Sequence, residues 1–181
     1  MTGTSQNLTT HGHDITMAEG TCLGLIASGH RHGWALVREL SPNGDLGQVW
    51  SLSRALTYRS IDRLIALDLV SRSGSEPGAG PARTLLATTP AGRRVVKRWV
   101  RTPVHHLRDI RTEFLVKLTL AERLGYDRLA LLDAQTEALA PIIAAVASSD
   151  TEPSNDALRL WRLESSQAVQ RFLERARSEL G

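Results

Sequence analysis

The stretch that decides the fold is residues 53–90, SRALTYRSIDRLIALDLVSRSGSEPGAGPARTLLATTP. Ser53 is a favoured N-cap residue, and the helix that it begins extends to about Leu67. The apolar residues of this helix lie mostly toward its C-terminal end, whereas its N-terminal half is polar and basic. A helix used only for packing more often carries an apolar stripe along its full length. The pattern therefore predicts a helix that presents a polar tip to a partner.

A β-hairpin is predicted directly after this helix. Residues 69–72 and 83–88 form two short strand-like runs, and residues 74–81 between them are rich in glycine and proline. Thr89 and Pro90 then supply the N-cap and the first-turn proline of a further helix. The order of elements in this part of the chain is thus polar-tipped helix, hairpin, helix.

Two shorter helices are predicted before this unit. Thr16 and Glu19 have the spacing of a capping box, and Gly29 ends the helix that they begin. A second helix is expected over residues 31–40, and the turn residues 41–44, Ser-Pro-Asn-Gly, stop it. This is the order of a winged helix-turn-helix, in which the third helix enters the DNA major groove and the hairpin, or wing, lies beside the neighbouring backbone.

Pro103 marks a change in composition. Three amphipathic helices are predicted after it, over about residues 107–124, 127–147 and 155–180. Their apolar stripes exceed what a small solitary bundle needs, which favours a dimer interface. The predicted fold class is mostly α with an α+β wing. The predicted domains are a mobile arm over residues 1–15, a winged helix-turn-helix DNA-binding domain over residues 16–102 and a helical dimerisation and effector domain over residues 103–181.

Composition and charge agree with a nucleic-acid partner. The chain has 181 residues, of which 41% are hydrophobic and 23% charged, as is typical of a soluble globular protein. Residues 1–100 carry eleven basic and seven acidic groups, net +4, whereas residues 101–181 carry eleven basic and twelve acidic groups, net −1. The basic half indicates a polyanionic partner there. No apolar stretch approaches 18 residues and no signal sequence is recognisable, so we expect a cytoplasmic protein with no membrane partner.

Several segments resemble the PadR family of bacterial transcriptional regulators. They are CLGLIASGHRHGWALVREL from residue 22, LSRALTYRSIDRLIALDLV from residue 52, GPARTLLATTPAGRR from residue 80 and, after the family's linker, LRDIRTEFLVKL from residue 107. The shared marks are His32-Gly33-Trp34, Tyr58-x-x-Ile61-x-x-Leu64, Pro81-x-Arg83 and Thr89-Pro90-x-Gly92. The resemblance fades beyond about Leu124. It implies a homodimer whose two winged heads address two half-sites of a near-palindromic double-stranded DNA operator.

Three features depart from the family pattern. Asp68 stands where the family usually has glycine between the recognition helix and the wing, and Thr57 stands where an apolar residue is usual. The returning strand lacks the tyrosine that often precedes its final Leu-Thr. Asp tolerates the left-handed conformation better than most residues but less well than glycine. The fold is compatible with these changes, whereas individual DNA contacts are expected to differ.

Nine residues are predicted to contact DNA. Arginine side chains can reach phosphates or guanine edges, and hydroxyl groups can donate hydrogen bonds to phosphates. The predicted DNA-binding residues are His32, Ser53, Arg54, Thr57, Tyr58, Arg59, Arg63, Arg72 and Arg83. The family resemblance further implies an aromatic-lined space at the dimer core that accepts a small, flat, aromatic or apolar effector. Trp99 and Trp161 are the candidates for it, the alternative being that both anchor the core or the interface.

Other function classes find less support in the sequence. The chain has no glycine-rich phosphate loop with a Gly-Lys-Ser/Thr ending and no nucleophile elbow, so we predict no catalytic residues, no enzyme activity and no cofactor. His11, His13 and Cys22 lack a second spaced cluster of ligands, so we predict no metal site. By the family resemblance, the protein is a repressor that a small-molecule effector releases. The alternative is a winged-helix protein–protein interaction module that does not bind DNA.

Overall fold

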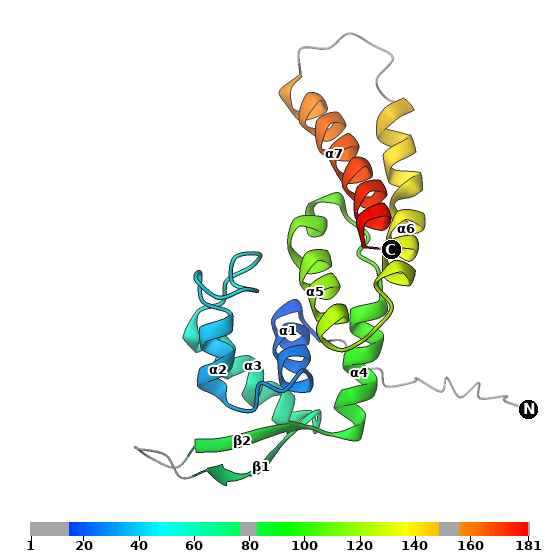
Figure 1. Cartoon of the computed structure of the whole chain (residues 1–181). Coiled ribbons are helices and arrows are strands. Elements are labelled where there is room, and N and C mark those ends of the chain that lie inside the picture. Colours follow the sequence, from blue (N-terminus) through cyan, green and yellow to red (C-terminus); the bar gives the residue numbers. More distant parts are fainter. Residues whose placement is uncertain (1–14, 77–82, 149–155, 181) are drawn as a thin grey trace, which may run out of the picture.

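Polar side-chain caps begin helices α1 and α3 in the computed structural model, which describes residues 15–76, 83–148 and 156–180 (Figure 1). At helix α1 (Met17–Ala27) the predicted capping box is present, with Thr16 and Glu19 each accepting the other's backbone N–H. Helix α2 (Gly33–Glu39) follows a short turn. At helix α3 (Arg54–Ala66) the Ser53 hydroxyl accepts the N–H of Leu56 at 3.2 Å. The order of these helices is the predicted one.

The wing is a two-stranded antiparallel sheet. Strand β1 (Val70–Glu76) pairs with strand β2 (Arg83–Thr88), and the register shifts by a bulge between Arg72 and Gly74. The N–H of Leu86 in β2 also donates to the carbonyl of Arg31 at 2.8 Å, so the turn between α1 and α2 is fastened to the wing. Helix α4 (Pro90–Arg101) begins directly after β2, as predicted.

Helix α1 lies at the centre of the N-terminal half. It is apolar on all sides, and it packs against α3, α4 and α5 (Leu115–Arg123). Because α5 follows Pro103 in the chain, the hydrophobic core extends across the predicted domain boundary. The largest fully buried side chains of this core include Leu23, Leu36, Leu64, Phe114 and Leu120.

The segment before α5 differs from the prediction. The sequence predicts one continuous helix over residues 107–124, but the chain forms a 3₁₀ turn (Leu107–Asp109), then a π turn (Ile110–Phe114), and only then α5. The prediction of continuity was wrong because the apolar spacing of these residues fits a helical face whether the backbone bonds are i→i+4 or i→i+5. Single π turns of this kind are often found at functional sites.

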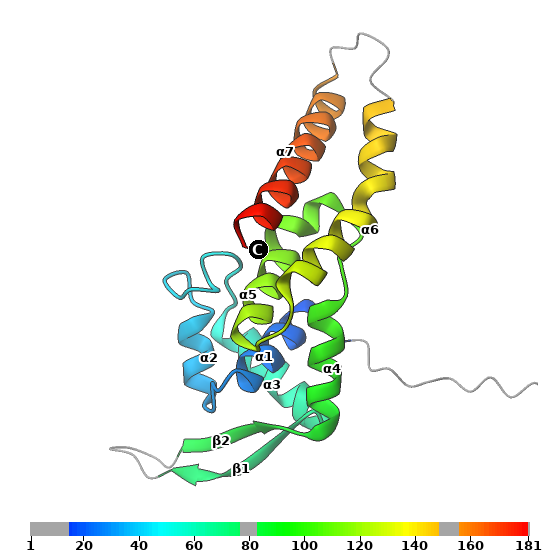
Figure 2. The same cartoon turned by 45° about the vertical axis from the view of Figure 1, so that its right-hand side comes forward.

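Helices α6 (Arg128–Ser148) and α7 (Ala157–Glu179) form a hairpin that extends away from the wing (Figures 1 and 2). The buried side-chain amide of Gln135 in α6 accepts from the N–H and donates to the carbonyl of Val104, both at 2.8 Å. Asp133 of α6 forms an ion pair with Arg177 of α7. These contacts fix α6 to the segment that contains Val104 and fix α6 and α7 to each other.

Helix α6 is the most apolar of the long helices in the described part of the chain. By length and composition it is apolar enough to cross a membrane, and 28% of its most apolar 18 residues are buried within the protein. It is not visible in the sequence as one uninterrupted apolar run, because Asp133 and Glu137 interrupt it. The prediction of no membrane partner stays a prediction.

Asp68, which stands where the family usually has glycine, has a left-handed backbone conformation. Its φ is +55°, and its N–H donates to the carbonyl of Ile65 at 3.0 Å in the turn that ends α3. Left-handed conformations are costly for residues with a Cβ atom. We expect Asp68→Gly to raise the free energy of unfolding by about 1 kcal/mol, as measured by urea denaturation.

A matched control for this variant is Gly125, which has a φ of +67° and open space where a Cβ would lie. Gly125→Asp is expected to lower the free energy of unfolding by about the same 1 kcal/mol, because only backbone strain is added. If Asp68→Gly left the free energy of unfolding unchanged or lowered it, the proposed backbone strain at Asp68 would be contradicted.

Candidate nucleic-acid interface

Helix α3 turns a basic face outward. Arg54, Tyr58, Arg59 and Arg63 are all exposed, and Ser53, the N-cap, is exposed beside them. None of the three arginines lies within ion-pair distance of a carboxylate in the described part of the chain. The guanidinium of Arg54 lies over the ring of Tyr58, 5.8 Å from its centroid. These five predicted residues are therefore available to an outside partner.

Thr57 is not available, and the prediction that it contacts DNA was wrong. Its side chain is fully buried, and its hydroxyl donates to the carbonyl of Ser53 at 3.0 Å. It lies on the face of α3 that packs against α1, together with Ile61 and Leu64. Thr57 therefore fills the apolar position of the family pattern as a packing residue.

Tyr58 is positioned by the turn that precedes α2. A Cβ on Gly33 would lie 2.7 Å from its ring, so the glycine allows the tyrosine to pack against the backbone. His32, the N-cap residue of α2, is half-buried, and its ring stacks on that of Trp34 with centroids 6.2 Å apart. The family mark His32-Gly33-Trp34 thus lies directly beside the exposed end of α3.

Trp34, the last residue of the family mark, lies at the surface. Its side chain is 42% exposed, and the guanidinium of Arg38 lies over its ring, 5.3 Å from the centroid. Val37 and Leu40 follow Trp34 at steps of three and six residues, a spacing that fits an apolar stripe and therefore does not indicate exposure. Only the exposure in the folded chain shows that Trp34 and Arg38 extend the outer surface near Tyr58.

The two arginines predicted to contact DNA from the wing are Arg72 and Arg83. Arg72 in β1 is 61% exposed and forms an ion pair with Asp62 of α3 at 3.5 Å, which joins the wing to α3. Asp62 was not among the predicted residues, although it occupies the middle of the exposed face of α3. Arg83 begins β2, but its side chain lies outside what the structure describes, as does Pro81.

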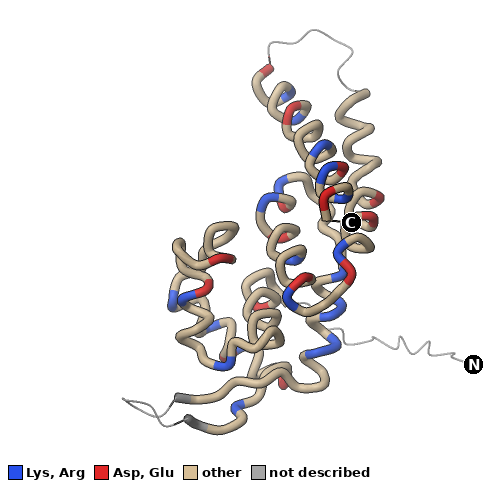
Figure 3. The backbone as a smooth tube through the Cα atoms, in the orientation of Figure 1, with Lys and Arg blue, Asp and Glu red and all other residues tan. Residues whose placement is uncertain are grey.

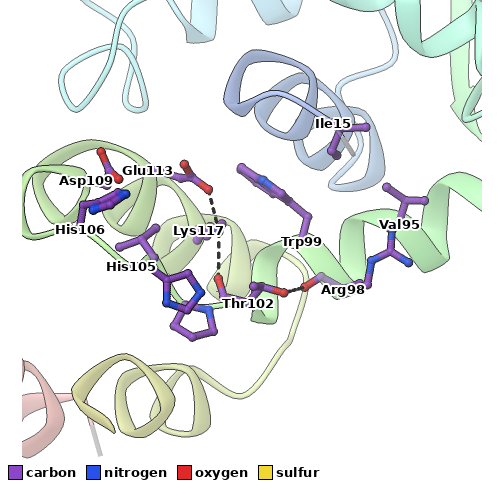
Figure 4. A pocket seen from close by; sticks show the side chains of 12 residues that line it. Ile15, Val95, Arg98, Trp99, Thr102, His105, His106, Asp109, Glu113 and Lys117 are labelled. Carbon is purple, nitrogen blue, oxygen red and sulfur yellow. Dashed lines mark hydrogen bonds and ion pairs between the residues drawn. The ribbon is translucent and has the colours of Figure 1, made fainter. Parts of the chain in front are cut away.

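Trp99 lines a cavity of about 370 Å³ between α4 and the turns before α5 (Figure 4). The buried ammonium of Lys117 lies 5.1 Å from the centroid of the Trp99 ring. It forms an ion pair with Glu113 at 2.7 Å and donates to the carbonyl of Thr102 at 2.9 Å. His105 and His106 complete the rim of this cavity. Because Lys117 is already neutralised, it stiffens the cavity wall and is not free to bind an anion.

Trp161 lies in a different place. It is 69% exposed on α7, beside exposed Leu158 and Leu160. It borders a largely apolar groove of about 750 Å³, which is also lined by Leu107, Arg108, Ile110 and Arg111. The structure therefore does not bring Trp99 and Trp161 into one site within a single chain. Whether either binds an effector stays a prediction.

Cysteine and histidine chemistry gives no second site in the described residues. Cys22 is buried in α1, and this burial raises the pKa of its thiol to about 12, so the thiol stays protonated at neutral pH. No group of three or more His, Cys, Asp or Glu side chains that could hold a metal ion occurs in the described ranges. His11 and His13 lie outside them.

The helices α1 to α4 and the intervening hairpin define a winged helix-turn-helix protein with an appended helical tail, and the predicted fold class is confirmed. Among solved structures, the chain is similar to the crystal structure of Bacillus subtilis PadR in complex with operator DNA. The two share 16% sequence identity with a TM-score of 0.45, and the alignment covers 88% of this chain and 97% of that chain. No protein-family model and no curated protein matches the chain.

Proposed function

We propose that this protein is a PadR-like, DNA-binding transcriptional regulator. One observation carries the proposal: Arg54, Arg59 and Arg63 are all exposed on the part of α3 that is not buried in the core. Arginine is the side chain best suited to phosphate oxygens and to the O6 and N7 acceptors of guanine. An exposed helix of this charge beside a wing is the arrangement that inserts into a major groove.

Each contacting group has a separate role in this proposal. Arg59 and Arg63 lie toward the middle and the end of α3 and reach phosphates or base edges, whereas the Tyr58 and Ser53 hydroxyls donate to phosphates. Arg72 is held by Asp62 at the base of the wing, where it faces the neighbouring backbone. Phosphate contacts fix the position of the helix, and base contacts supply sequence specificity.

The proposal includes a homodimer formed through α6 and α7. Leu158, Leu160 and Trp161 are each at least 60% exposed, which leaves an apolar surface on α7 that a second copy would cover. A two-fold symmetric dimer presents two α3 helices to two half-sites of a near-palindromic operator. Localisation in the cytoplasm, with the DNA, is part of the same proposal.

We further propose that the protein acts as a repressor that an effector releases. The cavity beside Trp99 lies at the junction of α4 with the turns before α5, so a ligand there contacts both the winged head and the helical tail. Because half-sites are fixed along the duplex, a change in the spacing of the two α3 helices would sacrifice contacts at one half-site. The operator would then be released.

The proposal is tested by titrating the purified protein against the DNA upstream of its own gene at several salt concentrations. If three arginines of each protomer neutralise phosphates, about six counterions are released per dimer, and the logarithm of affinity falls with a slope of about −5 against the logarithm of salt. The stoichiometry is expected to be two chains per duplex. A scrambled duplex of equal length is the control for specificity. No binding at low salt would instead favour a protein–protein interaction module.

A further inference from the structure

The outer face of α4 carries four cationic side chains, which we call the α4 stripe: Arg94, Lys97, Arg98 and Arg101. Their spacing of three, one and three residues places them along one side of the helix. All four are exposed, and together with Thr102 they line an open hollow of about 400 Å³. In Figure 3, α4 shows basic positions and no acidic one.

The positive charge of the α4 stripe is not compensated. Within the described ranges, no carboxylate lies within ion-pair distance of any of its four residues, whereas Arg123 pairs with Glu39 and Arg177 pairs with Asp133. Like charges four residues apart destabilise a helix, and the stripe contains two such pairs. The helix dipole favours cations in the last turn, but Arg94 lies too early in α4 to benefit from it.

The α4 stripe is separated from the proposed DNA interface. The buried residues of α4, Val95, Val96 and Val100, face α1 and α5, and the stripe lies on the opposite side of the helix. Helix α1 packs against α3 on one side and against α4 on another. A duplex that lies on α3 and the wing therefore does not run along the stripe.

We propose that the α4 stripe binds a small organic polyanion with two or more phosphate or carboxylate groups. Three guanidinium groups can each bind an oxyanion in bidentate fashion, and Lys97 adds a point charge between them. Arg98 and Thr102 also line the 370 Å³ cavity beside Trp99, so the uncharged part of such a ligand has adjoining space (Figure 4). The site goes beyond the proposed DNA binding and does not depend on it.

The test is calorimetric titration of the full chain with inorganic tripolyphosphate. The stripe variant carries Arg94→Gln and Arg98→Gln, and the control variant carries Arg162→Gln and Arg171→Gln, which removes the same charge from exposed positions of α7. Saturable binding is expected for the unmodified chain. The stripe variant is expected to bind about tenfold more weakly, and the control variant is expected to keep its affinity.

Three results would overturn the proposal. They are no saturable binding by the unmodified chain, an equal loss in both variants, and a loss of duplex DNA affinity in the stripe variant as large as its loss of tripolyphosphate affinity. The last result would make the stripe a DNA contact. A further variant, Arg94→Lys with Arg98→Lys, retains the charge but not the bidentate geometry, and it is expected to lose part of the affinity. Circular dichroism checks that each variant is folded.

Discussion

Replacing both Tyr58 and Arg63 by alanine is expected to lower the affinity for the upstream DNA by about 100-fold. A lost phosphate or base contact typically costs about 1–3 kcal/mol, and each tenfold in affinity corresponds to about 1.4 kcal/mol. Both side chains are exposed on α3, and Arg63 has no described carboxylate partner, so its loss leaves no unpaired charge inside the protein. Fluorescence anisotropy at fixed salt measures the change.

The salt dependence distinguishes the contribution of Arg63 from that of Tyr58. Loss of one phosphate contact in each protomer is expected to make the salt slope of the dimer less steep by about two. Tyr58→Phe keeps the ring that packs on Gly33 and removes only the hydroxyl, so it controls for misfolding of the turn. Lys97→Ala, at an exposed position of α4 away from α3, controls for total charge. Unchanged DNA affinity in a folded double variant would contradict the proposed function.

Local chemistry explains which elements the sequence predicted correctly. The caps at Thr16, Ser53 and Thr89 act within three residues of themselves, so their partners are visible in the sequence. The hairpin was also predicted from local signals, two short strand-like runs and a Gly- and Pro-rich loop. Interactions of short range therefore gave the order of elements and most of their bounds.

The features that were missed depend on packing between distant elements. Thr57 lies on the same face as Ile61 and Leu64, at steps of four and three residues, and this spacing indicates burial. Its polar side chain led instead to the prediction of a DNA contact. The ion pair of Asp62 with Arg72 needs the relative placement of α3 and β1. The sequence around Trp99 and Trp161 likewise does not indicate that the two side chains line separate cavities. Such contacts follow from tertiary structure alone.

Gly92 is predicted to be among the most sensitive positions of the N-terminal half. It belongs to the Thr-Pro-x-Gly mark, in which the Thr89 hydroxyl accepts the N–H of Gly92 at 3.0 Å and donates to the carbonyl of Asp68 at 2.7 Å. These bonds hold the first turn of α4 against the end of α3. A Cβ on Gly92 would lie 2.0 Å from the carbonyl oxygen of Leu69, which itself accepts the N–H of Thr89 at 3.1 Å.

Gly92→Ala is therefore expected to lower the free energy of unfolding by about 3 kcal/mol, because the obstructing atom is backbone and cannot rotate away. In an unobstructed helix the same change would stabilise by about 1 kcal/mol, so the expected sign is opposite to that of helix propensity. Ala91→Gly, one residue earlier and without this contact, is the matched control and is expected to lose only about 1 kcal/mol. Urea denaturation followed by circular dichroism measures both. If Gly92→Ala proved as stable as the unmodified chain, the close approach of α4 to the carbonyl of Leu69 would be wrong, and with it the placement of the wing relative to α3.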